Sequence, residues 1–202
     1  MFIGVPSVMV SLTGPHVFVE TLNDSYSETN ANQQITLEGQ AGGGNWYAGG
    51  HTFTSLGGNI SKAKFYLQKT GSPTGNLFAK LYAMAGTFGT TGVPTGAYLA
   101  KSDPFNSATL TGSGQLITFT FSGAQQYLMT NGTHYCIVCD AADDASNTVT
   151  TGSNLTVIWR SGPSATHPGN EFYTNSGWPS ATPSWNADPV GYDVIFYVYS
   201  LI

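Results

Sequence analysis

Two runs of alternating apolar and polar residues between positions 60 and 84 limit what this chain can fold into. Apolar side chains occupy every second position: Ala63, Phe65 and Leu67 in the first run, then Leu77, Ala79 and Leu81 in the second. A period of two places these side chains on one face of a β-strand, and that face packs on a core. Between the runs, Gly71, Pro73 and Gly75 favour a tight turn. The segment therefore predicts a β-hairpin that organises a β-sandwich.

Further short runs continue the strand pattern towards the C-terminus. They cover residues 97–102, 116–121, 134–140, 155–160 and 190–201. Asn131–Gly132 precedes the third of these runs, and Asn-Gly is a strong signal for a hairpin turn. No run has the period of a helix, and short strands separated by turn residues are typical of all-β folds. The sequence predicts an all-β fold, an antiparallel two-sheet β-sandwich.

The first 21 residues precede this pattern and are predicted to form an N-terminal extended arm. Its apolar residues are the candidate assembly contacts: Phe2, Ile3, Val8, Val10, Val17 and Phe18. An apolar arm with so few charges is expected to pack against protein. Two alternatives remain open, an edge strand of its own sandwich or an anchor that adds a strand to a neighbouring subunit. The predicted division is an arm at 1–21 and a sandwich domain at 22–202.

The charge content of the chain argues against one class of partner. Of the 202 residues, 8% are charged, and the net charge is −5. Nucleic-acid binding uses clustered Lys and Arg, so we expect no nucleic-acid partner. No apolar run approaches the ~20 residues of a membrane helix, so no membrane contact is expected. Residues 1–12 lack the basic start of a signal peptide, and secretion by that route is not expected either.

Several strings of residues resemble one family of β-sandwich modules. They are residues 64–75 (KFYLQKTGSPTG), 79–83 (AKLYA), 94–102 (PTGAYLAKS), 117–122 (ITFTFS), 131–135 (NGTHY) and 192–199 (YDVIFYVY). Together they are similar to the choice-of-anchor jelly-roll domains, which occur in phage structural proteins and bacterial surface proteins. The resemblance implies a jelly-roll fold and a place in such an assembly. It carries no catalytic signature.

The two cysteines, Cys136 and Cys139, lie in one predicted strand. A C-x-x-C spacing can indicate zinc binding or redox chemistry. Positions three apart in a strand point to opposite faces, so one strand cannot bring both sulfurs together. The sequence has no second pair of cysteines to complete a zinc site. We therefore predict two buried free thiols.

The densest group of oxygen ligands is Asp140, Asp143 and Asp144. A hard cation such as Ca²⁺ takes about six to eight oxygen ligands, so this group is the candidate calcium site. The spacing of an EF-hand loop is absent, and a solvated loop between strands is the alternative. No other cofactor is expected.

Aromatic and amide side chains gather between positions 167 and 185. Aromatic rings pack on the C–H faces of sugars, and amides form hydrogen bonds with sugar hydroxyls. The candidate glycan-binding residues are Tyr173, Trp178, Asn170 and, from a glycine-rich loop, Trp46. The alternative is that such rings cover the core, which is the role we expect for Trp185.

The motifs of common enzymes are missing from the sequence. It contains no nucleophile elbow, no zinc-protease helix and no phosphate-binding loop. We expect a non-enzymatic virion surface protein, such as a phage capsid decoration, head-fibre or tail-associated subunit. Its expected partners are other virion structural proteins and further copies of itself, with weak adhesion to glycans. The alternative is a carbohydrate-binding module of a bacterial surface protein, located outside the cell.

Overall fold

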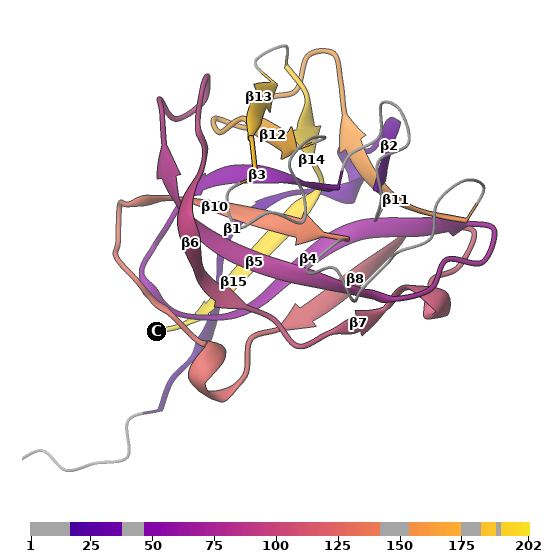
Figure 1. The fold of residues 1–202 in the computed structure, drawn as a ribbon. Helices are drawn as coiled ribbons and strands as arrows, with labels where there is room; N and C mark the ends of the chain where they lie inside the picture. The colour runs from indigo at the N-terminus through magenta and orange to yellow at the C-terminus, as the bar shows by residue number, and fades with distance from the viewer. Residues whose placement is uncertain (1–16, 38–46, 142–153, 175–182, 189–190) are drawn as a thin grey trace, which may run out of the picture.

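The computed structural model describes residues 17–37, 47–141, 154–174, 183–188 and 191–202. These residues form two antiparallel β-sheets that enclose one main core, together with three short 3₁₀ turns (Figure 1). The predicted all-β, two-sheet sandwich is therefore confirmed. No helix among the described residues has the length and apolar character needed to span a membrane.

In the described part of the chain, sheet A contains eight strands and sheet B contains seven. The strands of sheet A are β1 (Glu20–Tyr26), β2 (Gln33–Leu37), β4 (Gly58–Thr70), β8 (Gln115–Thr120), β9 (Leu128–Met129), β11 (Leu155–Ser161), β14 (Asp193–Val194) and β15 (Phe196–Leu201). The strands of sheet B are β3 (Ala48–Thr54), β5 (Asn76–Ala85), β6 (Val93–Lys101), β7 (Phe105–Asn106), β10 (His134–Asp140), β12 (Glu171–Thr174) and β13 (Asn186–Asp188). The 3₁₀ turns are η1 (Glu28–Asn30), η2 (Ser107–Thr109) and η3 (Gly123–Gln125).

The predicted hairpin between positions 60 and 84 is wrong, although both of its strands exist. Strand β4 pairs with β8, β9, β11 and β15 in sheet A, whereas β5 pairs with β6, β7 and β10 in sheet B. The turn at residues 71–75 therefore carries the chain from one sheet to the other. Gly71 and Gly75 both have positive φ, at +67° and +97°, as the turn residues predicted.

The Asn131–Gly132 turn makes a second connection between the sheets instead of a hairpin. Gly132 has a φ of +76°, which the Asn-Gly signal predicts. The strand before the turn, β9, pairs with β4 in sheet A, and the strand after it, β10, joins sheet B. Short turns thus link the two layers of the sandwich at both positions.

The main core lies between the sheets and is built from the predicted alternating residues. Ala63, Phe65 and Leu67 of β4 are fully buried, and they face Leu77 and other residues of sheet B in the same apolar cluster. Phe65 meets Phe119 edge to face, with ring centroids 6.0 Å apart. Full burial of one such side chain stabilises a fold by roughly 1.5–3 kcal/mol, so this alternation supplies much of the driving force.

A smaller apolar cluster covers the outer face of sheet B. It contains Tyr82, Cys136 and Phe172, and the half-buried ring of Trp185 packs on it. The ring centroid of Trp185 lies 6.0 Å from that of Tyr82 and 5.5 Å from that of Phe172, which confirms the expected packing role of Trp185. Cys139 faces the main core instead. Both cysteines are free and buried on opposite faces of β10, as predicted.

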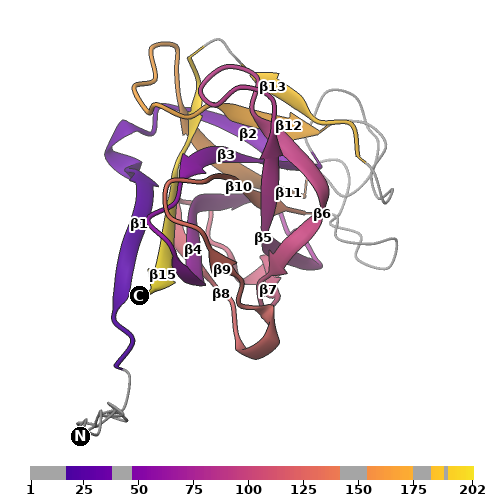
Figure 2. The same cartoon turned by 90° about the vertical axis from the view of Figure 1, so that its left-hand side faces the viewer.

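The described part of the N-terminal arm belongs to sheet A. Val19 exchanges two backbone hydrogen bonds with Ile202, at 3.0 and 3.1 Å, and β1 then pairs with β15 along its length (Figure 2). The boundary predicted at residue 21 therefore falls inside a strand. Val17 and Phe18 precede that strand and are exposed, whereas Phe2, Ile3, Val8 and Val10 lie outside the described residues.

Candidate functional site: a polar pocket above a buried histidine–carboxylate network

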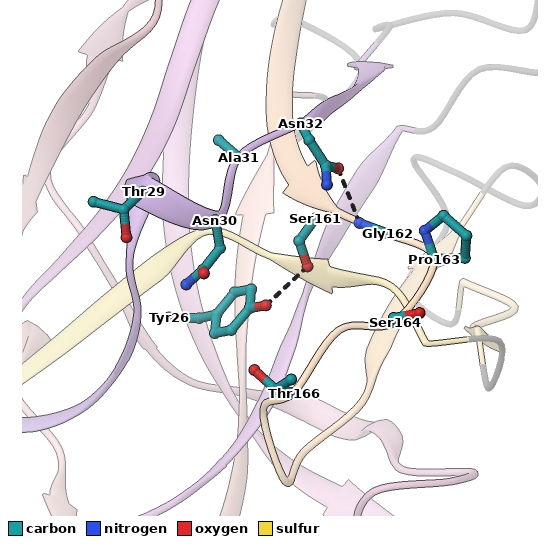
Figure 3. Close-up of a pocket in the computed structure, with 10 residues that line it drawn as sticks. All are labelled: Tyr26, Thr29, Asn30, Ala31, Asn32, Ser161, Gly162, Pro163, Ser164 and Thr166. Carbon is teal, nitrogen blue, oxygen red and sulfur yellow. Dashed lines mark hydrogen bonds between the residues drawn. The ribbon is translucent and has the colours of Figure 1, made fainter.

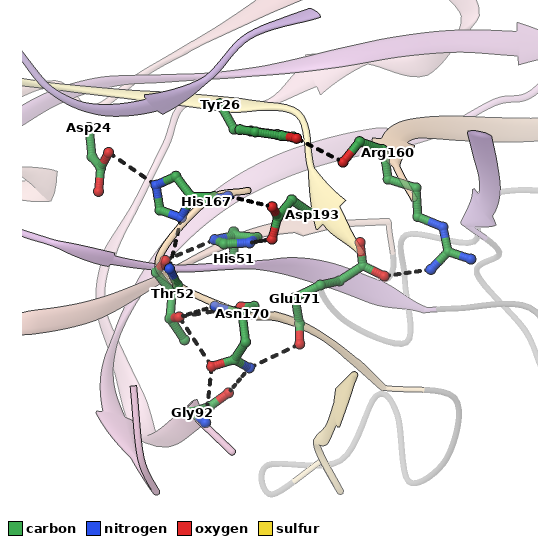
Figure 4. A network of polar contacts seen from close by, with 12 residues as sticks. Asp24, Tyr26, His51, Thr52, Gly92, Arg160, His167, Asn170, Glu171 and Asp193 are labelled. Carbon is green, nitrogen blue, oxygen red and sulfur yellow. Dashed lines mark hydrogen bonds and ion pairs between the residues drawn. The ribbon is translucent and has the colours of Figure 1, made fainter. Parts of the chain in front are cut away.

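At one end of the sandwich, the side chains between the two sheets are polar instead of apolar. Asp193 comes from β14 of sheet A, and His51 and Glu171 are paired across β3 and β12 of sheet B. The segment 162–170 connects β11 to β12 and passes beside these side chains (Figure 4). Buried polar groups require partners, so this end of the molecule is held by specific pairs.

His51 and Asp193 form the central pair of this network. The distance from His51 Nε2 to Asp193 Oδ1 is 2.7 Å, and the two side chains are 0% and 3% exposed. His51 Nδ1 lies 2.8 Å from the backbone oxygen of Thr52. Burial lowers the pKa of His51, against the opposing effect of Asp193. The ring also stacks on Phe196, with centroids 5.0 Å apart, so its orientation is fixed from three sides.

His167 extends the network towards β1. Its backbone N–H donates to Asp193 Oδ2 at 2.9 Å, and its Nε2 lies 3.2 Å from Asp24 Oδ1. Burial raises the pKa of Asp24, but hydrogen bonds, above all that from His167, outweigh burial and lower it overall. The His167 ring meets the Tyr26 ring edge to face at 6.0 Å. These contacts anchor the segment 162–170 to sheet A, and the His167 ring also meets the His51 ring of sheet B, with centroids 4.7 Å apart.

Arg160 and Glu171 form a second buried pair between the sheets. Arg160 Nη1 donates to Glu171 Oε1 at 2.6 Å and lies 3.6 Å from Asp188 Oδ2. The Arg160 guanidinium also covers the Tyr192 ring, 4.0 Å from its centroid. Burial raises the pKa of Glu171 to about 8, although Arg160 opposes this effect. Glu171 Oε2 has no hydrogen-bond partner among the described residues.

Above this network lies a pocket of about 340 Å³ (Figure 3). Two chain segments line it: Tyr26, Thr29, Asn30, Ala31 and Asn32 from the first, and Ser161, Gly162, Pro163, Ser164 and Thr166 from the second. The lining offers hydroxyl and amide groups, and Tyr26 is the only ionisable side chain among the described residues that form it. The pocket can therefore form many hydrogen bonds without carrying a charge.

Close packing fixes the walls of the pocket. Asn32 Oδ1 accepts from the Gly162 N–H at 3.0 Å, which ties the two lining segments together. A Cβ at Gly162 would lie 1.9 Å from the Tyr192 ring, so only glycine fits there. Ser164 has a φ of +104°, a conformation that costs a non-glycine residue about 1–3 kcal/mol. Its N–H donates to Gly191 O at 3.2 Å and helps to hold it in place.

Of the four predicted glycan-binding residues, the structure describes Asn170 and Tyr173. Asn170 is buried, and its amide donates to Gly92 O and to Glu171 O at 2.9 and 3.0 Å. The Asn170 amide is thus used inside the protein, and the predicted contact of Asn170 with a glycan stays a prediction. Tyr173 is half-buried and packs against the main core. Trp46 and Trp178 lie outside the described residues.

The candidate calcium ligand that the structure describes is Asp140. Its Oδ2 lies 2.6 Å from Lys80 Nζ, and both side chains are buried on sheet B. Asp140 is thus part of an ion pair at the end of β10 instead of a solvated loop, and Asp143 and Asp144 lie outside the described residues. No group of three or more His, Cys, Asp or Glu in the described part of the chain is arranged to hold a metal ion.

Sequence reasoning missed both the network and the pocket. A signal for the network was present, because Arg160 is the only arginine of the sequence and lies in a predicted strand that is otherwise mostly apolar. A charge in such a place needs a buried partner, and Glu171 is the acidic residue nearest to it along the chain. Comparison with protein-family models, with curated proteins and with solved structures finds no match.

Proposed function

We propose that the chain is a non-enzymatic subunit on the surface of a virion, attached to its neighbours by its N-terminal end. One observation carries this proposal: large apolar side chains are exposed together at that end of the sandwich. We call this set the apolar end, and its members are Val17, Phe18, Val19, Leu56, Leu128 and Ile202. Exposed apolar patches of this kind on soluble proteins mark interaction sites.

Strand register places the members of the apolar end close to one another. Val19 pairs with Ile202 beside the end of β15. Leu201 is opposite Asn59 of β4, and Asn59 is in turn opposite Leu128 of β9. Leu56 lies two residues before β4, in the connection from β3. These segments therefore meet at the same end of sheet A.

The edge of sheet A offers a second means of attachment at this end. Strand β1 pairs with β15 on one side and is the last strand of the sheet among the described residues. Such an edge presents backbone N–H and C=O groups to which a partner can add a strand. The partners we propose are other virion proteins and further copies of this chain. The resemblance of several of its strings to choice-of-anchor domains of phage structural proteins favours a virion over other assemblies.

Incorporation into particles tests this proposal. The variant Val17→Ser/Phe18→Ser removes two exposed apolar side chains, 79% and 61% exposed, that are not members of the main core. We expect this variant to fold but to be lost from purified particles in quantitative mass spectrometry. Tyr98→Ser is the matched control, because Tyr98 is an exposed ring on β6, away from the apolar end. Equal incorporation of both variants would refute attachment through this end.

A carbohydrate-binding module is the second candidate function. The uncharged pocket favours it, because hydroxyl and amide groups in a cavity match the hydroxyl groups of sugars. This function is compatible with attachment to an assembly, since the pocket and the apolar end involve different residues. Binding of the purified protein to an array of immobilised oligosaccharides tests it directly.

A further inference from the structure

We propose that the pocket between residues 26–32 and 161–166 binds one neutral sugar unit, a pyranose at the end of a glycan chain. This inference rests on the second candidate function and is independent of attachment through the apolar end. The pocket has a volume of about 340 Å³, which lies at the small end of the range of about 300–1,000 Å³ that is typical of small-molecule sites. The space suits a single ring better than an extended chain.

The charge of the lining selects a neutral ligand. Among the described residues that line the pocket, none carries a carboxylate, ammonium or guanidinium group. The nearest guanidinium, that of Arg160, is paired with Glu171 and covers the Tyr192 ring behind Gly162. A phosphate, sulfate or carboxylate in the pocket would lack a cationic partner, and an ion taken out of water without one is strongly disfavoured.

The floor of the pocket holds an unused hydrogen-bond donor. Ser161 Oγ donates to the Tyr26 hydroxyl at 3.0 Å, and both residues are more than nine-tenths buried. Two hydroxyl groups carry two hydrogens, and their mutual bond uses only one of them. No other partner for either hydroxyl is recorded among the described residues. Water can accept from this hydroxyl in the free protein, and a sugar oxygen in the pocket can take the place of that water.

The walls add groups that both donate and accept. No side-chain hydrogen bond is recorded for Asn30 or Thr166 among the described residues, and both line the pocket near the Tyr26 ring (Figure 3). The Asn32 oxygen is occupied by the Gly162 N–H, which leaves its amide hydrogens for a ligand. Sugar hydroxyls donate and accept at the same atom, so mixed groups of this kind match them. Pro163 supplies an apolar surface for the C–H groups of the ring.

The pocket is formed before any ligand binds. The Tyr26 ring is held by the edge of His167, which is itself fixed by Asp24 and Asp193. Ser164 keeps its unfavourable φ at the rim, where the Gly191 oxygen accepts from its N–H. A rigid site loses little conformational freedom on binding, so a few hydrogen bonds can support a measurable affinity.

Binding to an oligosaccharide array tests the inference. The probes are oligosaccharides that end in neutral hexoses or N-acetylhexosamines, with sialylated and sulfated chains as a charged set. The pocket variants are Tyr26→Phe, which keeps the ring, and Asn30→Ala and Thr166→Val, which change exposed side chains. The matched control is Gln125→Ala, an exposed amide on η3. We expect binding to neutral probes, weakened about tenfold by each pocket variant and unchanged in the control.

Each other outcome is decisive. If neutral probes bind and no pocket variant changes their affinity, the chain binds glycans at another place. That result overturns the pocket assignment but leaves the carbohydrate-binding candidate standing. Absence of binding to every neutral probe overturns both the pocket assignment and the carbohydrate-binding candidate. Binding restricted to charged probes contradicts the inference from the uncharged lining. Thermal unfolding of each variant shows whether a loss is due to unfolding, and the exposed positions Asn30 and Thr166 give a readout even if Tyr26→Phe does not fold.

Discussion

The side chains of His51 and Asp193 are 142 residues apart in the sequence and meet at 2.7 Å inside the sandwich. His51 belongs to sheet B and Asp193 to sheet A, so their contact joins the two layers. The same aspartate accepts from the His167 N–H and thereby positions the segment that forms one wall of the pocket. Stability and the shape of the candidate site are thus linked through one carboxylate.

Breaking this buried pair is expected to destabilise the protein strongly. Removal of His51 leaves the buried Asp193 Oδ1 without this hydrogen-bond partner, and leaving a buried polar group unpaired costs about 1–3 kcal/mol. We expect His51→Ala to lower the free energy of unfolding by this amount in urea denaturation. Lys62→Ala is the matched control, because its exposed pair with Glu20 should contribute at most about 1 kcal/mol. Equal effects of the two substitutions would contradict the structural role of the His51–Asp193 pair.

The raised pKa of Glu171 predicts that stability falls as the pH rises. In the unfolded chain this carboxyl has its ordinary pKa of 4.5, and burial raises it to about 8 in the folded protein. Between these values the folded state binds a proton that the unfolded state has released, so stability decreases with increasing pH. The lowered pKa of His51 has the opposite sign, but it acts below the ordinary value of 6.5. Between pH 6.5 and 8 the change in stability is therefore expected to have the sign that Glu171 gives it.

Thermal unfolding of Glu171→Gln across this interval provides the test. The amide is neutral at every pH, so the decrease in melting temperature between pH 6.5 and 8 should become smaller than in the original chain. Glu20→Gln is the control, because the pKa of Glu20 is lowered, chiefly by its hydrogen bond with Lys62, and its titration lies below this interval. An unchanged slope in Glu171→Gln would show that this carboxyl is already ionised at pH 6.5.

The two cysteines are expected to be unreactive in the folded protein. Burial raises the pKa of both thiols well above their ordinary value, and only the thiolate reacts quickly. An aromatic disulfide reagent at pH 8 should therefore detect no thiol in the native state and two in denaturant. Rapid reaction of one thiol under native conditions would contradict its burial on β10.

Packing against Tyr192 predicts that Gly162→Ala is damaging. A Cβ at this position would lie 1.9 Å from the ring, so the ring and the pocket wall must move. We expect a loss of about 1–3 kcal/mol of stability, as overpacking of a tight contact typically causes. Gly112→Ala is the matched control, because a Cβ there meets open space. Urea denaturation of both variants makes the comparison, and a stable Gly162→Ala protein would argue that this wall is mobile.

The period of the sequence predicted the strands of this fold but not their partners. Alternation places Phe65 and Leu67 on the core face of β4 whichever strand lies beside it. The same glycine turns, however, suit a hairpin and a connection between sheets equally well. Pairing of β4 with β15 depends on residues more than 130 positions apart, such as Phe65 and Phe196, and no local pattern encodes such a separation.

The candidate site was hidden from the sequence for the same reason. The pocket consists of two segments separated by about 130 residues, and each is an unremarkable run of small polar residues. The aromatic and amide residues around Tyr173 gave a more obvious composition, but Asn170 of that group is used inside the protein. Composition identifies the kinds of contact that a chain can make, whereas the fold decides which of them remain available to a ligand.

Imaging of intact particles tests the central claim of surface attachment most directly. Electron cryomicroscopy of purified virions should show the sandwich on the outside, with Val19 and Ile202 against a neighbouring subunit and the pocket at Tyr26 facing solvent. Particles that lack the chain would contradict this account. A sandwich whose apolar end points into solvent would contradict it equally.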